Sequence, residues 1–320
     1  MSNDKKLVSL LIPCYNEELA LPRFCEELDT TLAASDSYDY EIFFVNDGSK
    51  DGTQTFITNL AEHDSRISFI LLSRNFGKEN AMLAGFDYLS GDCAIILDAD
   101  LQDPPSLIPR MLELWEQGYQ DVYAKRAGRG KESWLRKKLS LLYYRILDSS
   151  TRFEVLQNVG DFRLLDRKCI EALRQMRETE RYTKGMFSWI GYRKAELVFD
   201  RGNRVDGKGK QGFLSLFNLA IEGLTSFTTA PLRLASVMGF IIAFFAFGFL
   251  LFYLFKTIIF GDPVQGFPTL VTIILFLGGI QLLCMGILGE YIGRIFNETK
   301  RRPPYLVEVY HKGSAITDTL

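Results

Sequence analysis

Short apolar runs alternate with longer amphipathic stretches over the first 120 residues of the chain. Apolar runs at 7–12, 42–45, 67–72 and 93–97 have the length of buried strands, and a polar cluster follows each of them. The stretches between them have a helical period: one runs from Asn16, a predicted N-cap, to about Ala33, one opens at Thr53, and one covers 79–89. This alternation predicts βαβ units and a largely parallel sheet, which places the chain in the α/β class.

The polar clusters after these strands are expected to gather along one edge of the sheet, where ligands bind in open α/β folds. The strand at 93–97 is followed by Asp98 and Asp100, with Asp103 just before a Pro-Pro pair. Two carboxylates at such an edge predict a hard divalent cation, Mg²⁺ or Mn²⁺, which usually keeps a substrate phosphate as a further ligand. The alternative is an acidic loop that caps the next helix, with Asp103 as its start signal.

Four further side chains have a functional and a structural interpretation, and both stay open at this stage. Asp47 suits hydrogen bonds to a nucleoside, or an ordinary Asn-Asp-Gly turn. Lys78 suits a phosphate, or a solvated helix start. Asp161, with Arg163 close behind, suits a general base or the organisation of an acceptor phosphate, or else an ion-paired structural turn.

The middle of the chain is rich in cations. A basic amphipathic helix is predicted at about 133–151, which fits either a membrane surface or the domain's own core. The loop at 200–210 combines glycines with Arg204, Lys208 and Lys210. Glycines allow close backbone approach and cations supply charge, so this loop predicts phosphate binding, with a solvated linker as the alternative.

The last third of the chain predicts a membrane hairpin. Residues 234–255 and 267–289 contain no charged residue, and each stretch is about the 20 residues needed to cross a bilayer. Cations flank both outer ends, so the positive-inside bias puts both termini in the cytoplasm. We expect a cytosolic domain at 1–211, an amphipathic juxtamembrane helix at 212–231, two spans at about 234–256 and 267–290 within 232–293, and a cytosolic tail at 294–320.

The overall composition of the chain limits which binding partners and which compartment are expected. A chain of 320 residues with 47% hydrophobic content can bury a full core, and a net charge of −2 gives no reason to expect nucleic acid. The five cysteines are scattered without a C-x-x-C pair, which predicts neither a zinc site nor a disulfide framework. The polar start is too unlike a signal peptide to predict export of the N-terminal part.

Taken in order, the motifs PxYNEE, VNDGSxDGT, RNFGK, DADLQDPP, NVGDFRL and GEYIGR resemble those of the family 2 glycosyltransferases with a GT-A fold. More closely, the chain is similar to bacterial bactoprenol (polyprenyl-phosphate) glucosyltransferases, which act in glucosylation of O-antigen and other cell-envelope glycans. The resemblance covers nearly the whole chain, hairpin included. It implies a Rossmann-like cytosolic domain joined to a transmembrane hairpin.

The resemblance also implies residue roles. Pro13, Tyr15, Glu17 and Asp47 would hold the uridine, and Asp98 and Asp100 would bind the metal and donor diphosphate with Gln102 nearby. Asp161 matches the family's proposed base, and Asp161 and Asp100 are the predicted catalytic residues. Arg204 and Lys210 match a phosphate-binding motif R-x-x-G-x-[ST]-K, in which Gly209 replaces the hydroxyl residue, so the choice between Lys208 and Lys210 stays open.

The implied reaction is inverting transfer of a hexose, glucose foremost, from a UDP-sugar to undecaprenyl phosphate at the cytoplasmic face of the bacterial inner membrane. The resemblance further implies a homotetramer. Two alternatives remain: the same chemistry with UDP-N-acetylglucosamine, GDP-mannose or an aminoarabinose donor, and an inactive sugar-nucleotide-binding adaptor. A processive synthase is disfavoured because the Q-x-x-R-W motif and additional spans are missing from the sequence.

Overall fold

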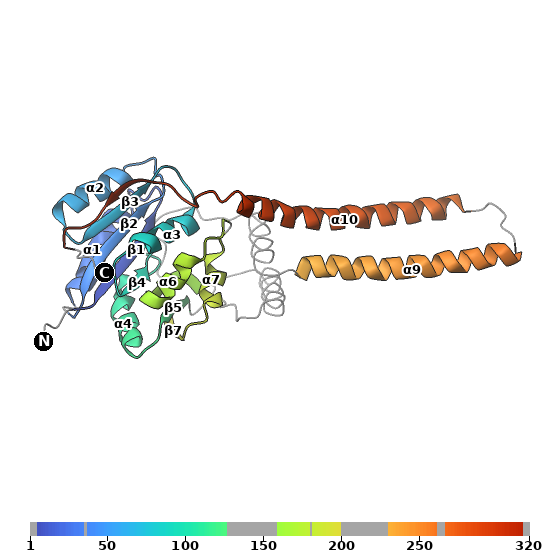
Figure 1. Cartoon of the computed structure of the whole chain (residues 1–320). Coiled ribbons are helices and arrows are strands. Elements are labelled where there is room, and N and C mark those ends of the chain that lie inside the picture. Colours follow the sequence, from blue (N-terminus) through green and yellow to red (C-terminus); the bar gives the residue numbers. More distant parts are fainter. Residues whose placement is uncertain are drawn as a thin grey trace.

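The computed structural model describes residues 5–34, 37–126, 159–179, 181–199, 230–260 and 266–315. Within these ranges the chain forms a globular head with two long helices that extend from it side by side (Figure 1). The predicted basic helix at 133–151, the cations Arg204, Lys208 and Lys210, and nearly all of the juxtamembrane helix at 212–231 lie outside the described residues.

The head is built on an eight-stranded sheet in the order β7-β5-β6-β4-β1-β2-β3-β8. Its strands are β1 (Leu7–Cys14), β2 (Asp39–Asn46), β3 (Ile67–Leu72), β4 (Cys93–Ile96), β5 (Asp121–Arg126), β6 (Val159–Asp166), β7 (Lys194–Phe199) and β8 (Val307–His311). Strands β4, β1, β2 and β3 pair in parallel, as do β5 and β7, whereas β6 and β8 run antiparallel to their neighbours. The predicted α/β class with a mostly parallel sheet is confirmed.

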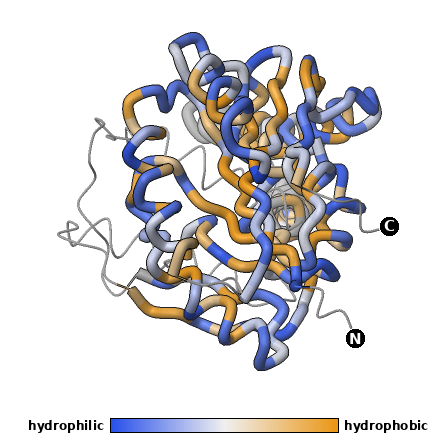
Figure 2. The backbone as a smooth tube through the Cα atoms, turned by 90° about the vertical axis from the view of Figure 1, so that its left-hand side faces the viewer, coloured by the Kyte–Doolittle hydropathy of each residue, from blue (hydrophilic) through white to orange (hydrophobic). Residues whose placement is uncertain are grey.

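Helices cover both faces of the sheet. They are α1 (Leu21–Ala33), α2 (Thr53–His63), α3 (Lys78–Tyr88), the 3-10 turn η1 (Pro105–Leu107), α4 (Ile108–Glu116), α6 (Arg167–Gln175) and α7 (Thr183–Trp189). Alternate side chains of each central strand face opposite layers, so Leu10 and Ile12 pack with α1 and α4 whereas Leu11 packs with α3 and α6. Figure 2 shows hydrophobic backbone running through the middle of the head and hydrophilic stretches at its edge.

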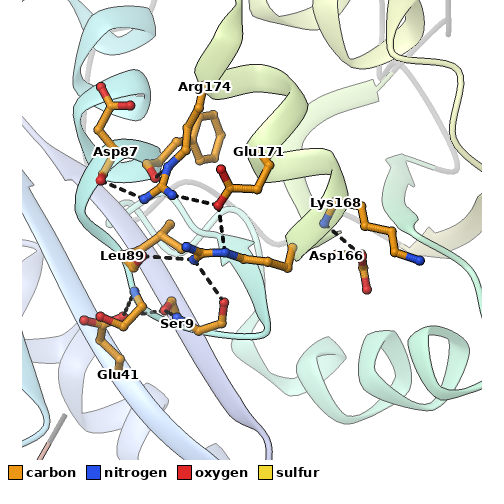
Figure 3. Close-up of polar contacts among 12 residues, drawn as sticks. Ser9, Glu41, Asp87, Leu89, Asp166, Lys168, Glu171 and Arg174 are labelled. Atoms are coloured by element: carbon orange, nitrogen blue, oxygen red, sulfur yellow. Dashed lines mark hydrogen bonds and ion pairs between the residues drawn. The ribbon is translucent and has the colours of Figure 1, made fainter. Parts of the chain in front are cut away.

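Arginines of α6 hold this helix against the C-terminal end of α3. Arg174 donates to the carbonyl oxygens of Phe86 and Asp87 at the end of α3, and Arg167 donates to the carbonyl of Leu89 at 3.1 Å (Figure 3). Glu171 bridges the two guanidinium groups at 2.9 and 2.7 Å. These bonds occupy the last carbonyls of α3, which no residue of that helix can satisfy.

The hairpin consists of α9 (Ala230–Phe260) and α10 (Phe267–Thr299), which confirms the two predicted helices. By length and composition, one stretch of the described residues, Phe276–Thr299, is long and apolar enough to cross a membrane, and it is not buried. Its exposed side chains include Leu282 at 72% and Met285 at 66%. Exposed apolar surface of this extent marks contact with a membrane or another protein.

The predicted tail contributes a strand that the sequence did not indicate. Strand β8 pairs antiparallel with β3, so the end of the chain completes the sheet after the hairpin. The N–H of Gly313 donates to the Ser68 hydroxyl at 3.0 Å, and Ser68 donates to the fully buried carboxylate of Glu41 at 3.1 Å. Glu41 also accepts a bond from Ser9, which links β1, β2, β3 and the tail in one buried network.

The segment between α10 and β8 is anchored by its own contacts. The Tyr305 hydroxyl donates to Asp87, whose carboxylate also takes both ends of the Arg177 guanidinium at 2.6 and 2.8 Å. At the end of α10, Glu298 accepts the N–H of Thr179 at 2.7 Å. The head therefore holds the hairpin from its C-terminal side.

Changing Tyr305 to phenylalanine tests this anchor. A hydrogen bond to a charged group contributes roughly 1.5–3 kcal/mol, so its loss should let the segment detach roughly ten- to a hundredfold more often. Limited trypsin digestion of the full chain should show correspondingly faster cleavage between Lys300 and Arg302, with the other cleavage rates of the head unchanged. Equal rates in the two proteins would show that Tyr305 does not hold the segment.

Candidate functional site

The loops that follow β1, β2, β3 and β4 lie together at the carboxyl edge of the sheet, as predicted. Asn16, between β1 and α1, is tied to the loop after β2: its N–H donates to the Ser49 hydroxyl at 3.0 Å and its side-chain oxygen accepts the N–H of Lys50 at 2.8 Å. It has a left-handed φ of 56°, and α1 begins later, at Leu21. The prediction that Asn16 caps that helix is therefore wrong, because its side chain serves the neighbouring loop.

The candidate nucleoside-binding residues lie at the end of β1 and in these first two loops. Pro13 pairs with Val45 across β1 and β2, Tyr15 is 42% exposed, and the N–H of Glu17 donates to the Thr53 hydroxyl at 2.8 Å. The structure thus brings together chain segments that the sequence separates by more than one element. Their contact with uridine stays a prediction.

Asp47 holds two of these loops together. Its two carboxylate oxygens accept the N–H groups of Phe76 and Gly77 at 2.7 and 2.9 Å, and the residue is 3% exposed. Burial raises the pKa of Asp47 above its ordinary value, although these backbone bonds lower it. Gly48 has a φ of 64°, and a Cβ there would meet the Arg74 backbone at 2.4 Å, so only glycine lets the two loops approach.

Asp98 and Asp100 follow β4 directly. The N–H of Gln102 donates to the Asp100 carboxylate at 3.1 Å, and Leu101 between them has a left-handed φ of 56°. Such a conformation is uncommon for a bulky side chain and costs about 1–3 kcal/mol, which proteins retain chiefly at functional loops. Gln102 itself is buried, at 6% exposure.

Lys78, the first residue of α3, joins a candidate metal-binding carboxylate, Asp98, to the candidate base, Asp161. Its Nζ lies 2.7 Å from Asp98 Oδ1 and 2.7 Å from Asp161 Oδ2. Burial lowers the pKa of Lys78, but the charges of Asp161 and Asp98 outweigh this and raise it above its ordinary value. In the structure the ammonium group is paired with carboxylates, so its predicted contact with phosphate stays a prediction.

Asp161 lies on strand β6, so the prediction of a turn at this position is wrong. Burial raises the pKa of Asp161, but the charges of Lys78 and Lys184 lower it below its ordinary value. One oxygen, Oδ1, is buried without a hydrogen-bond partner in the part of the chain that the structure describes. The site therefore holds an ionised carboxylate with an unused acceptor atom.

Arg163, which the sequence placed among the phosphate contacts, lies in the core instead. Its side chain is 2% exposed, its Nη1 lies 3.2 Å from the buried carboxylate of Asp121, and its guanidinium stacks 3.8 Å from the Phe187 ring centroid. Burial raises the pKa of Asp121 and the charge of Arg163 lowers it, with a net rise. We leave Arg163 out of the phosphate-binding set because its charge is already paired away from solvent.

Two residues of the site have no counterpart in the motifs. Glu79, next to Lys78, accepts the N–H of Thr183 at 3.0 Å and so ties the start of α7 to the start of α3. Burial and then the charge of Asp161 raise the pKa of Glu79 to about 7. Lys184, which follows Thr183, is exposed. Neither residue could be recognised from spacing, because α7 reaches the site only through the fold.

The carboxylates at this edge fit a divalent cation that shares its coordination with a substrate. The described residues contain no cluster of three or more histidine, cysteine, aspartate or glutamate side chains that could hold a metal ion. Mg²⁺ is usually bound through one or two carboxylates, with phosphate oxygens and waters as the other ligands. The hard oxygen donors of Asp98 and Asp100 match that need.

Comparisons with known proteins cover both parts of the molecule. Residues 9–174 match Glycosyl transferase family 2, and residues 230–295 match the GtrB C-terminal hairpin. The SfII prophage-derived bactoprenol glucosyl transferase of Shigella flexneri is 41% identical over 307 residues, which cover 96% of this chain and 99% of that protein.

Two further relatives match over a similar length. A prophage bactoprenol glucosyl transferase homolog of Escherichia coli (strain K12) is 42% identical over 301 residues, which cover 94% of this chain and 98% of that protein. The uncharacterized glycosyltransferase sll0501 of Synechocystis sp. is 42% identical over 300 residues, which cover 94% of each.

Proposed function

The chain belongs to glycosyl transferase family 2 and is a glycosyltransferase with a GT-A fold, and from this premise we propose that it transfers a hexose, glucose foremost, from a UDP-sugar to polyprenyl phosphate. The observation that carries the proposal is the Asp98–Lys78–Asp161 contact. It puts the candidate diphosphate site and the candidate base one ammonium group apart. Transfer between two bound substrates needs such proximity.

The donor half of the site is assigned to the loops after β1, β2 and β4. Pro13, Tyr15, Glu17 and Asp47 hold the uridine, and Asp98 and Asp100, with Gln102 beside them, hold Mg²⁺ or Mn²⁺. The ion, when bound, neutralises charge that develops on the departing diphosphate. The protein's own part is to fix these carboxylates at the sheet edge.

The acceptor half is assigned to Asp161 and to cations. A phosphate monoester has a second pKa of about 6 and is largely dianionic at pH 7, so it needs little deprotonation. An aspartate with a lowered pKa is a weak base, which is sufficient here because it only orients the acceptor and takes the remaining proton. Arg204, with Lys208 or Lys210, holds the acceptor phosphate against repulsion from the donor.

The hairpin is assigned to the membrane, where a lipid acceptor is found. Matches to the GtrB hairpin and an exposed apolar stretch in α10 support association with the membrane. We infer that both helices cross the bilayer, that the head at 1–211 and both termini lie in the cytoplasm, and that the protein acts as a homotetramer at the bacterial inner membrane. These points extend the sequence-based predictions.

A transfer assay tests the function and its metal requirement. The full chain in detergent is given radiolabelled UDP- and GDP-sugars with undecaprenyl phosphate, and either Mg²⁺, Mn²⁺ or EDTA. We expect labelled lipid from UDP-glucose with a divalent ion, and a loss of at least about 10²-fold in EDTA because the diphosphate then leaves unneutralised.

The other outcomes of this assay are informative. Label from UDP-N-acetylglucosamine, GDP-mannose or an aminoarabinose donor alone would retain the mechanism and correct the sugar. Nucleotide binding without labelled lipid from any donor would favour an inactive sugar-nucleotide-binding adaptor. Full activity in EDTA would remove the metal from the proposal.

A further inference from the structure

Helix α7 is fixed from two sides next to Asp161. Its first residue, Thr183, donates its N–H to Glu79 at 3.0 Å, and Glu79 adjoins Lys78, which contacts Asp161 at 2.7 Å. Its buried side packs Phe187 on the guanidinium of Arg163, two residues from Asp161 on β6. These contacts leave the start of α7 little freedom to move relative to the candidate base.

The residue that α7 presents at this point is Lys184. It is exposed, and in the ranges that the structure describes its ammonium group takes part in no hydrogen bond or ion pair. Its charge acts on both Asp161 and Glu79 and lowers the pKa of each. Lys184 is thus a cation close enough to act on the charge of Asp161 without forming an ion pair with it. The ion pair of Asp161 is made by Lys78.

Unpartnered polar atoms occur on the elements that surround Asp161. Seven buried side-chain atoms lack a hydrogen-bond partner among the described residues, and all belong to α3, β6, α7 or the residue Arg181 just before α7. Asp161 Oδ1 and Thr183 Oγ1 are two of them. Buried polar groups are nearly always satisfied, so the unpartnered Asp161 Oδ1 and Thr183 Oγ1 point to a ligand that completes their hydrogen bonds.

We propose that Lys184 binds the phosphate of the acceptor, with Glu79 as the residue that positions it through the backbone of Thr183. The ligand class is a phosphate monoester, and the inference rests on the proposed function. A monoester at neutral pH offers anionic oxygens to Lys184 and, in its protonated form, a hydroxyl to the free oxygen of Asp161. The donor diphosphate is esterified at both ends and carries no phosphate hydroxyl at neutral pH. It therefore cannot donate a hydrogen bond to the unpaired oxygen of Asp161.

Binding of a short-chain prenyl phosphate to the full chain in detergent, without donor, tests this assignment. We compare wild type with Lys184→Gln, Lys184→Arg and, as a matched control, Lys168→Gln, which removes an exposed lysine of α6. Lys184→Gln should weaken prenyl phosphate binding about tenfold or more, because a hydrogen bond to a charged group is lost. Lys184→Arg should restore most of it, and Lys168→Gln should change nothing.

UDP binding in the presence of Mn²⁺ is the second readout and should be the same in all four proteins. Equal weakening of UDP and prenyl phosphate by Lys184→Gln would place the lysine at the donor and overturn the proposal, as would no weakening of either. Binding of inorganic phosphate is measured in the same four proteins. It should be weaker than binding of prenyl phosphate, and Lys184→Gln should weaken it by a similar factor. A dependence confined to inorganic phosphate would overturn the assignment to a lipid acceptor.

Failure of the two proposals can be told apart. If wild type binds prenyl phosphate in a Lys184-dependent manner but transfers no hexose, the proposed function falls and the phosphate site stands. If hexose transfer is normal in Lys184→Gln at every prenyl phosphate concentration, the proposed function stands and the role of Lys184 is refuted. An increase in KM for the lipid with an unchanged KM for the UDP-sugar would support both.

Discussion

Replacing Asp161 by asparagine should lower the turnover of hexose transfer by about 10²-fold, the low end of the contribution of a positioned acid or base, because the acceptor phosphate needs little deprotonation. Asparagine keeps the shape of the side chain but loses the charge that pairs with Lys78 at 2.7 Å. It also loses the unused carboxylate oxygen that we assign to the acceptor. Single-turnover transfer at saturating donor and lipid is the measurement, because it isolates the chemical step from product release.

The control for this variant removes a half-exposed carboxylate of the head that has no assigned role in the site. Glu196 on β7 pairs with Lys125 at 2.8 Å on the surface, and Glu196→Gln should change turnover by less than about twofold, since exposed ion pairs contribute little. Binding of the UDP-sugar should be retained in both variants. Full turnover in Asp161→Asn with intact binding would remove the base role from Asp161.

Replacing Arg163 by methionine should destabilise the head by about 3–5 kcal/mol, because the buried carboxylate of Asp121 would lose its partner. Both side chains are almost fully excluded from solvent, so water cannot compensate. For a head of this size such a loss corresponds to a drop of roughly 6–20 °C in the unfolding midpoint. Thermal unfolding of the full chain in detergent, followed by circular dichroism, measures it.

The double variant Arg163→Met with Asp121→Leu gives the decisive comparison. Replacing both charges by apolar groups of similar size removes the unpaired carboxylate and should recover most of the lost stability. A double variant as unstable as the single one would show that the loss came from the Phe187 stack and not from the ion pair. In that case the energetic argument for the pair would be wrong.

The sequence predicted those parts of the fold that local pattern controls. Each strand of the central parallel group was expected within a few residues of its observed bounds, because four to six buried apolar residues bounded by turn signals are a strong strand signal. The gathering of Asp47, Lys78 and Asp98 followed from the geometry of parallel strands, which needs no knowledge of side-chain contacts.

The rest depended on pairing between distant segments. Strand β8 is short, has four exposed residues out of five, and pairs with β3 from the far end of the chain, so periodicity gives no sign of its partner. Arg163 resembled a surface cation until Asp121 was found opposite it in the core. Lys184 and Glu79 belong to no motif and come together only because α7 folds back onto α3.

The position of β8 after the hairpin has a consequence for biosynthesis. During translation the chain emerges from its N-terminus, so β3 is made early while its edge partner follows only after both long helices. Until then the edge of β3 stays open, and open apolar edges invite pairing with other chains. Synthesis of the hairpin therefore precedes completion of the sheet, and a fragment cut before the hairpin would leave the ribosome with its sheet unfinished and prone to aggregate.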